Sequence, residues 1–217
     1  MKNRNLAIIA IIVGFATTSC SLSQMSTSKL VKKTTTKVAT NAIYGNYNWA
    51  KENLNVSTFR NGDPIPEVKT DEEWEKAGKE GKPAWCYYKN DQKNEKKYGK
   101  LYNWYAVSDP RGLAPEGYKI PTGVDIEKLI KSTGRSAANA VTKELVKGGK
   151  TGFNSKLGGE RDRNGVFHGL KEKTKYWTTD KSKDTNAVSL YVGGKYNMSG
   201  KSDYSCGKGL YVRCIKE

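Results

Sequence analysis

The chain has 217 residues, of which 36% are hydrophobic and 10% aromatic, enough for a packed core, so a fully disordered chain is excluded. Its 38 basic and 22 acidic residues give a formal net charge of +16, which excludes an acidic solvating tail. With one histidine and four cysteines, the composition argues against the usual multi-ligand zinc sites, and we predict no metal and no cofactor.

The N-terminus has the pattern of a secretory signal. Lys2 and Arg4 precede an uncharged run over residues 6–16, and Thr-Thr-Ser then leads to Cys20. A membrane-spanning helix needs about twenty apolar residues, and this run is too short to form one. We therefore predict that residues 1–19 direct secretion and are removed.

Small residues directly before a cysteine resemble the lipobox of bacterial lipoproteins, in which that cysteine carries the lipid and becomes the new N-terminus. The resemblance implies lipidation of Cys20 and a cell-envelope location, as an outer-membrane lipoprotein facing the periplasm or the surface. Thr17 stands where the lipobox usually has an aliphatic residue. Ordinary signal-peptidase cleavage near Ser19, without a lipid, is therefore the alternative.

Residues 20–43 are rich in Ser, Thr and Lys and contain neither an acidic nor an aromatic residue. Such a composition cannot offset its own ordering entropy, so we predict a tether. Its lysines suit a segment close to anionic headgroups, and a solvated spacer is the other interpretation.

From Tyr44 to Glu217 the pattern predicts one α+β domain with short antiparallel sheets and two to three helices. Thr70 with Glu73, and Thr122 with Asp125, have the spacing of helix N-caps. A third helix is predicted over 137–146. Tyr-, Val- and Ile-rich runs bounded by turn residues predict strands over 101–107, 187–192 and 210–215. Basic residues are scattered through the domain, and together with the secretion signal this argues against a nucleic-acid partner.

Several aromatic and turn blocks resemble the Fibrobacter succinogenes major paralogous domain, a family of secreted and lipid-anchored bacterial proteins. The blocks are 49–56, 61–66, 84–88, 98–107, 113–122, 152–153, 158–162, 176–179 and 212–214. The resemblance implies a C-type lectin-like fold, shared with formylglycine-generating enzymes, in which the chain ends meet in a small sheet and an irregular region carries the ligand site. It implies no established activity.

In an oxidising compartment, two of Cys86, Cys206 and Cys214 are expected to pair. Cys86 and Cys214 lie in the family blocks, so the resemblance favours a Cys86–Cys214 disulfide. A Cys206–Cys214 bridge across a hairpin is the alternative. A formylglycine-type oxidase would need two redox cysteines near the C-terminus, and the spacing and flanking residues of Cys206 and Cys214 differ from that pattern.

Two loop regions carry the candidate ligand residues. The charged, glycine-rich segment 159–168 holds Arg161, Asp162 and His168, which suit a carboxylate or sugar hydroxyls. A turn-capping role for the lone histidine is the alternative. The segment 195–204 holds Tyr196, Asn197 and Tyr204, whose rings suit sugars and protein surfaces alike.

No catalytic motif accompanies these residues. The sequence has no Gly-x-Ser-x-Gly, no carboxylate pair marked by its context, and none of the calcium-site motifs of C-type lectins. We therefore expect a membrane-anchored protein that binds a polysaccharide or an envelope protein without catalysis. The alternative is a structural or assembly component of an outer-membrane complex.

Overall fold

The structure, a computed structural model, describes residues 41–44, 47–193 and 198–217. These residues all belong to one unit of the chain, Thr35–Glu217. The predicted signal, the lipidation at Cys20 and most of the predicted tether lie outside the described residues. The first strand, β1, covers Asn41–Tyr44 and so begins before the domain boundary expected at Tyr44. Among the described residues, no helix is long and apolar enough to cross a membrane.

The fold is α+β, as predicted. The α-helices of the described residues are α1 (Asp71–Lys79), α2 (Glu95–Tyr98), α3 (Trp104–Val107), α4 (Gly123–Ser132) and α5 (Ala138–Leu145). Two 3₁₀ turns, η1 (Tyr88–Asn90) and η2 (Gln92–Asn94), lead into α2.

The three longer helices form where the local sequence predicts them. The Thr70 side chain accepts a hydrogen bond from the Glu73 backbone N–H at the start of α1. At the start of α4, Thr122 and Asp125 form a complete capping box, each side chain accepting from the other's backbone N–H. These caps satisfy donors that the helix itself leaves unpaired, so a few residues fix where α1 and α4 begin, whereas α5 begins without a side-chain cap.

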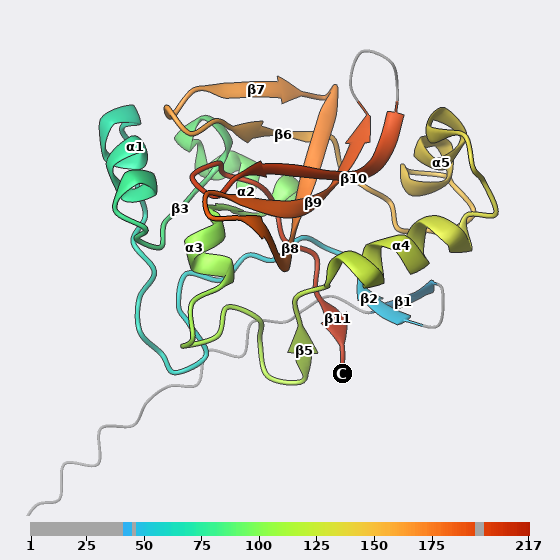
Figure 1. Cartoon of the computed structure of the whole chain (residues 1–217), viewed down its shortest axis with the longest axis horizontal. Coiled ribbons are helices and arrows are strands. Elements are labelled where there is room, and N and C mark those ends of the chain that lie inside the picture. Colours follow the sequence, from blue (N-terminus) through green and yellow to red (C-terminus); the bar gives the residue numbers. More distant parts are fainter. Residues whose placement is uncertain (1–40, 45–46, 194–197) are drawn as a thin grey trace, which may run out of the picture. The chain divides into compact units, whose positions relative to one another are not determined.

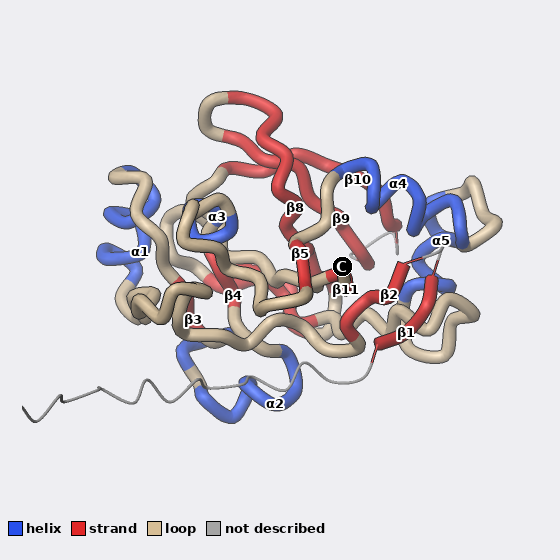
Figure 2. Tube along the Cα trace, turned by 90° about the horizontal axis from the view of Figure 1, so that it is seen from below, coloured by secondary structure: helices blue, strands red, loops and turns tan. Residues whose placement is uncertain are grey.

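A small sheet brings together strands from both ends of the domain. Its order is β1-β2-β11-β5, with β2 at Tyr47–Ala50, β5 at Tyr118–Lys119 and β11 at Ile215–Lys216. Figure 2 shows β11, next to the C-terminus, between β2 and β5. The two ends of the described domain therefore meet in a sheet. A second small sheet pairs β3 (Trp85–Cys86) with β4 (Leu101–Tyr102).

The largest sheet has the strand order β10-β9-β8-β6-β7 (Figure 1). Its strands are β6 (Gly158–Arg161), β7 (Phe167–Leu170), β8 (Lys173–Lys183), β9 (Asn186–Gly193) and β10 (Met198–Ser205). All neighbours are antiparallel except β6 and β8, which run parallel, so this sheet is mixed rather than purely antiparallel.

Helices α4 and α5 lie against one face of β10. The Thr142 hydroxyl of α5 shares a hydrogen bond of 2.7 Å with the Ser199 hydroxyl of β10. Lys201 of β10 pairs with Glu127 of α4. Because side chains alternate along a strand, the residues between these positions point to the opposite face.

Two of the three predicted strands are only partly strands. The run 101–107 forms β4 and then turns into α3, because the Asn103 side chain accepts from the Ala106 N–H and starts a helix. The run 210–215 is mostly a buried segment that makes isolated bridges, such as Leu210 with Tyr102, before β11. The third predicted strand, 187–192, lies within β9 and is confirmed.

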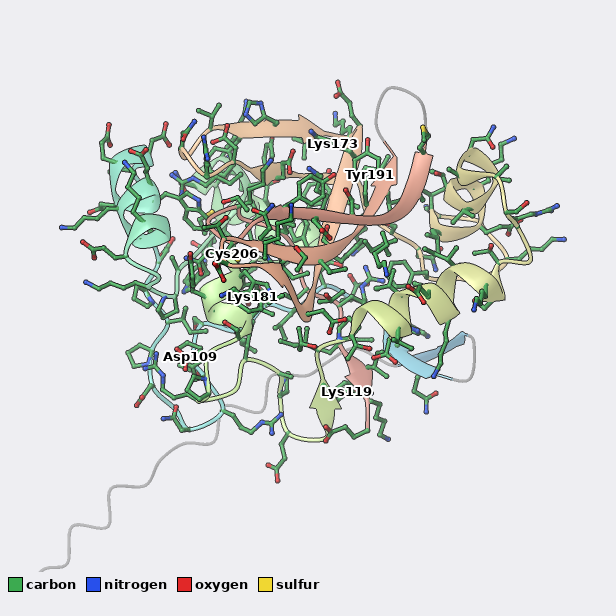
Figure 3. All side chains as sticks on the ribbon, viewed as in Figure 1. Asp109, Lys119, Lys173, Lys181, Tyr191 and Cys206 are labelled. Carbon is green, nitrogen blue, oxygen red and sulfur yellow. The ribbon has the colours of Figure 1, made fainter. Side chains whose placement is uncertain are left out.

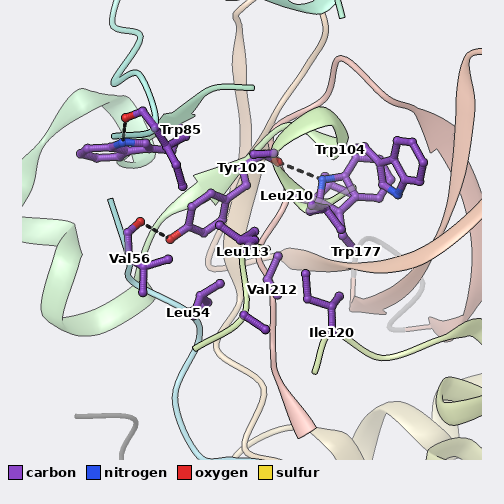
Figure 4. Packing of buried hydrophobic residues seen from close by; sticks show 14 of the residues in the cluster. Leu54, Val56, Trp85, Tyr102, Trp104, Leu113, Ile120, Trp177, Leu210 and Val212 are labelled. Carbon is purple, nitrogen blue, oxygen red and sulfur yellow. Dashed lines mark hydrogen bonds between the residues drawn. The ribbon is translucent and has the colours of Figure 1, made fainter. Parts of the chain in front are cut away.

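The core contains all five tryptophans of the chain, each at most 7% exposed. Figure 4 shows part of one hydrophobic cluster, where the Tyr102 hydroxyl donates to the Val56 carbonyl at 2.6 Å. The Trp177 indole in turn donates to the Tyr102 carbonyl at 2.9 Å. The aromatic family blocks therefore serve mainly to build the interior, and these two buried polar groups are each matched to a backbone carbonyl.

Candidate binding site

Arg161, a predicted ligand residue, is engaged by the protein itself. Its side chain is fully buried and stacks over the rings of Trp74 and Phe167, at 4.6 and 4.8 Å from the ring centroids. Its guanidinium donates hydrogen bonds to the carbonyls of Val68, Lys69, Thr70 and Gly165 and to the carboxylate of Asp71. Arg161 thus connects the start of α1 to the β6–β7 hairpin, and its full burial leaves it inaccessible to a ligand.

Asp162 begins the turn of that hairpin, and His168 lies on β7 just after it. Asp162 Oδ1 accepts from the backbone N–H groups of Asn164 and Val166, at 2.9 and 3.0 Å. Its Oδ2 lies 3.0 Å from Nε2 of His168. Burial opposes ionisation, but these hydrogen bonds outweigh it and lower the pKa of Asp162. This geometry is that of a turn cap, the alternative that the sequence left open.

Tyr204, from the second predicted region, lines a groove on the largest sheet. The hollow has a volume of about 210 Å³ and is bordered by Tyr191, Met198, Gly200, Ser202 and Tyr204, among others. It is smaller than the roughly 300–1,000 Å³ of clefts that enclose whole ligands, so it suits a single ring. The predicted partners Tyr196 and Asn197 lie outside the described residues.

Strand register explains how the groove forms. Tyr191 of β9 is paired with Gly200 of β10, and Tyr204 is paired with Ala187. Between these rows lies the pair Ser189 and Ser202. Paired residues share a face, so two large rings flank a floor of small residues on the face away from α4 and α5. A bulky residue at Gly200 or Ser202 would fill the hollow.

A buried ion pair lies beside the groove. Glu160 is 3% exposed, and its carboxylate is 2.6 Å from Nζ of Lys175. The same Nζ lies 3.6 Å from the centroid of the Tyr204 ring and 5.8 Å from that of Tyr191. Both tyrosines are therefore held over the ammonium group, which fixes the walls of the groove.

Gly159 allows the β6 backbone to bring Glu160 into this position. Its φ is +75°, and a Cβ here would lie 2.5 Å from both the Tyr88 ring and the His168 carbonyl oxygen. Any other residue would therefore be strained and would clash. The family block Gly-Gly-Glu-Arg-Asp thus contains a residue that the structure requires for backbone geometry.

The predicted Cys86–Cys214 disulfide is wrong. Cys86, Cys206 and Cys214 are all free thiols, buried to 1% exposure or less. Cys86 packs in one hydrophobic cluster and Cys214 in the other, whereas a bridge needs Cα atoms about 4.4–6.8 Å apart. The alternative Cys206–Cys214 bridge is absent too. Burial raises the pKa of Cys86 and Cys214 to about 12 and also raises that of Cys206.

A family model describes nearly all of the domain. Residues 43–216 match the Fibrobacter succinogenes major domain. The chain belongs to this family. No curated protein and no solved structure gives a significant match.

Within this Fibrobacter succinogenes major domain, sequence reasoning missed one wall of the groove, Tyr191, and the charged cluster beside the groove, which consists of Glu160, Lys173, Lys175 and Lys208. The alternation Lys173-x-Lys175 before a Tyr-Trp pair is the one local signal, since it places both lysines on one face of a strand. Across the described ranges, no group of three or more His, Cys, Asp or Glu side chains could hold a metal ion.

Proposed function

We propose that this family member is a lipid-anchored protein of the cell envelope whose domain, C-type lectin-like in fold, binds a saccharide without catalysis. The anchor rests on the lipobox-like residues before Cys20. The single observation that supports saccharide binding is the groove, in which Tyr191 and Tyr204 flank a floor of glycine and serine.

The chemistry of the groove suits a sugar ring. A pyranose presents an apolar face of C–H groups and a polar rim of hydroxyls, and tyrosine presents an apolar face with a hydrogen-bonding edge. The side chains of Tyr191 and Tyr204 are half-buried, so part of each ring reaches solvent. Met198, 47% exposed at the border of the groove, adds apolar surface.

Other functions have weaker support among the described residues. A formylglycine-type oxidase needs a thiol that solvent can reach, and the thiols of Cys206 and Cys214 are buried with raised pKa values. An assembly component needs a broad exposed apolar patch. The exposed large hydrophobic residues of the described chain are Val124, Val166 and Met198, which stand on α4, the β6–β7 turn and β10.

A glycan array followed by calorimetry on the full-length chain tests the proposal. Tyr191→Ala and Tyr204→Ala are each expected to lower affinity for captured saccharides by about tenfold, because each removes one stacking wall. Tyr204→Phe keeps the ring and separates stacking from hydroxyl contacts. Tyr105→Ala, at a half-buried tyrosine of α3 that does not line the groove, is the matched control. Unchanged affinity in the double alanine variant would refute the proposal.

A further inference from the structure

The ion pair beside the groove is unbalanced in charge. Glu160 contacts three ammonium groups: those of Lys175, of Lys173 at 2.8 Å, and of Lys208 at 3.6 Å. In the part of the chain that the structure describes, no other carboxylate forms an ion pair with any of these lysines. One negative charge therefore faces three positive charges, and the cluster carries a net charge of +2.

This excess charge is partly removed from water. The Lys175 side chain is 4% exposed, and those of Lys173 and Lys208 are 26% and 22% exposed. Charged groups at such depth require a counter-charge, because water no longer screens them fully. Burial lowers the pKa of Lys175 even though Glu160 opposes the shift. A second anion near the cluster would stabilise it.

The cluster and the groove share their walls. Lys208 Nζ lies 5.3 Å from the centroid of the Tyr204 ring, whose face also covers Lys175. Lys173 and Lys175 stand on the same face of β8, and Lys175 is paired with Tyr191. Figure 3 shows Lys173 and Tyr191 close together near one end of the sheet. A ligand stacked on the tyrosines therefore reaches the partly exposed lysines.

We propose that the groove selects an acidic saccharide, whose anionic substituent pairs with Lys173 and Lys208 while its ring stacks on Tyr191 and Tyr204. This inference rests on the proposed function and adds the class of sugar. Lysine binds as a compact point charge, without the planar fork by which arginine matches a carboxylate. The site therefore recognises negative charge rather than a planar group, and a uronate carboxylate, a sulfate ester or a phosphate ester can supply that charge.

The test compares pairs of probes that share a sugar backbone and differ in whether its substituent is charged. The full-length chain is titrated with a galacturonate tetrasaccharide and with its methyl ester, which keeps the sugar ring and removes the charge. A sulfated galactan tetrasaccharide and its desulfated form make the second pair. We expect each acidic probe to bind at least about tenfold more tightly than its neutral partner in low salt, with the ratio falling as salt rises.

Lysine variants then assign the effect. Lys173→Gln and Lys208→Gln are each expected to lower the affinity for the acidic probe by about three- to tenfold. The ratio of the affinity for the acid to the affinity for its ester should therefore also fall. Lys173→Arg, which keeps the charge, should retain most of the affinity for the acidic probe. Lys181→Gln is the matched control, because Lys181 is an exposed lysine of β8 well away from Lys173 in Figure 3.

The outcomes separate the two proposals. Equal affinity for acid and ester refutes the choice of an acidic sugar and leaves saccharide binding standing. Binding of neither form refutes saccharide binding itself. Equally tight binding of a single-stranded oligonucleotide, lost in the same lysine variants, shows a general polyanion site and overturns the selection of a sugar. Variants are compared only where circular dichroism shows the wild-type fold.

Discussion

Glu160→Gln tests whether the buried carboxylate holds the lysine cluster together. Glutamine keeps the size and shape of the side chain and removes its charge. Three ammonium groups would then face one another beside the groove without the carboxylate that now pairs with each of them. Removing one partner from a buried ion pair costs about 3–5 kcal/mol, because the remaining charge is uncompensated.

The pKa of Glu160 gives a second, independent value for the stabilisation that its ionised carboxylate provides. Burial alone would raise this pKa, but the ammonium groups, Lys175 first, lower it from 4.5 to about 2. One pKa unit corresponds to about 1.4 kcal/mol, so the ionised carboxylate stabilises the fold by about 3 kcal/mol. The folded pKa lies below the unfolded one. The contribution is therefore complete at pH well above 4.5 and is lost as the pH falls towards 2.

Urea unfolding of wild type and Glu160→Gln at several pH values measures this contribution. We expect the variant to lose about 3 kcal/mol at pH 7, and the difference to fall to less than half of that near pH 3. Glu127→Gln is the control, because Glu127 forms an exposed pair with Lys201 and its loss should leave stability unchanged. A cost below about 1 kcal/mol at pH 7, or one that does not depend on pH, would contradict the electrostatic explanation.

Two further substitutions and one labelling experiment test other parts of the fold. Arg161→Lys should lower the free energy of unfolding by roughly 3 kcal/mol, because lysine cannot reach the same set of carbonyls, and hydrogen exchange should rise first at the start of α1. Asn103→Ala should lower the free energy of unfolding in urea by about 2 kcal/mol, because the cap of α3 and the hydrogen bonds to the Ala84 N–H and the Lys82 carbonyl are lost. Native protein should resist iodoacetamide at Cys86, Cys206 and Cys214, and mass spectrometry should find all three alkylated in denaturant without added reductant. A pair that stays unmodified until reduced would show a disulfide.

The parts of the fold that the sequence predicts well are those encoded locally. Thr70 and Thr122 begin helices because a hydroxyl and an acid three residues later satisfy each helix's first donors or favour its N-terminus. Asn103 is also a local signal, but it lies inside a run rich in Tyr, Trp and Val, which favours a strand. The side-chain cap outweighed that propensity, because the Asn103 amide also bonds the Ala84 N–H and the Lys82 carbonyl.

The groove depends on contacts that no local pattern contains. Tyr191 and Tyr204 become neighbours only through the β9–β10 register. Lys175 meets Glu160 only because β6 and β8 run parallel and pair at Gly159 and Thr174. Lys208, which lies in the turn after β10, is the third lysine to contact Glu160. Since these contacts depend on the pairing of strands, composition and spacing could suggest Tyr204 but not the residues around it.

The segment 159–168 illustrates the difference between naming a region and naming a residue. Its charged residues suggested a ligand site, and Arg161 was the natural candidate. In the structure, Arg161 donates hydrogen bonds to the start of α1. Asp162 accepts hydrogen bonds from the turn that follows it and lies within hydrogen-bond distance of His168. Glu160, one residue earlier, points instead to the lysines of the groove. Adjacent residues of one strand face opposite sides, so the same short segment both fastens a helix and supplies the carboxylate beside the groove.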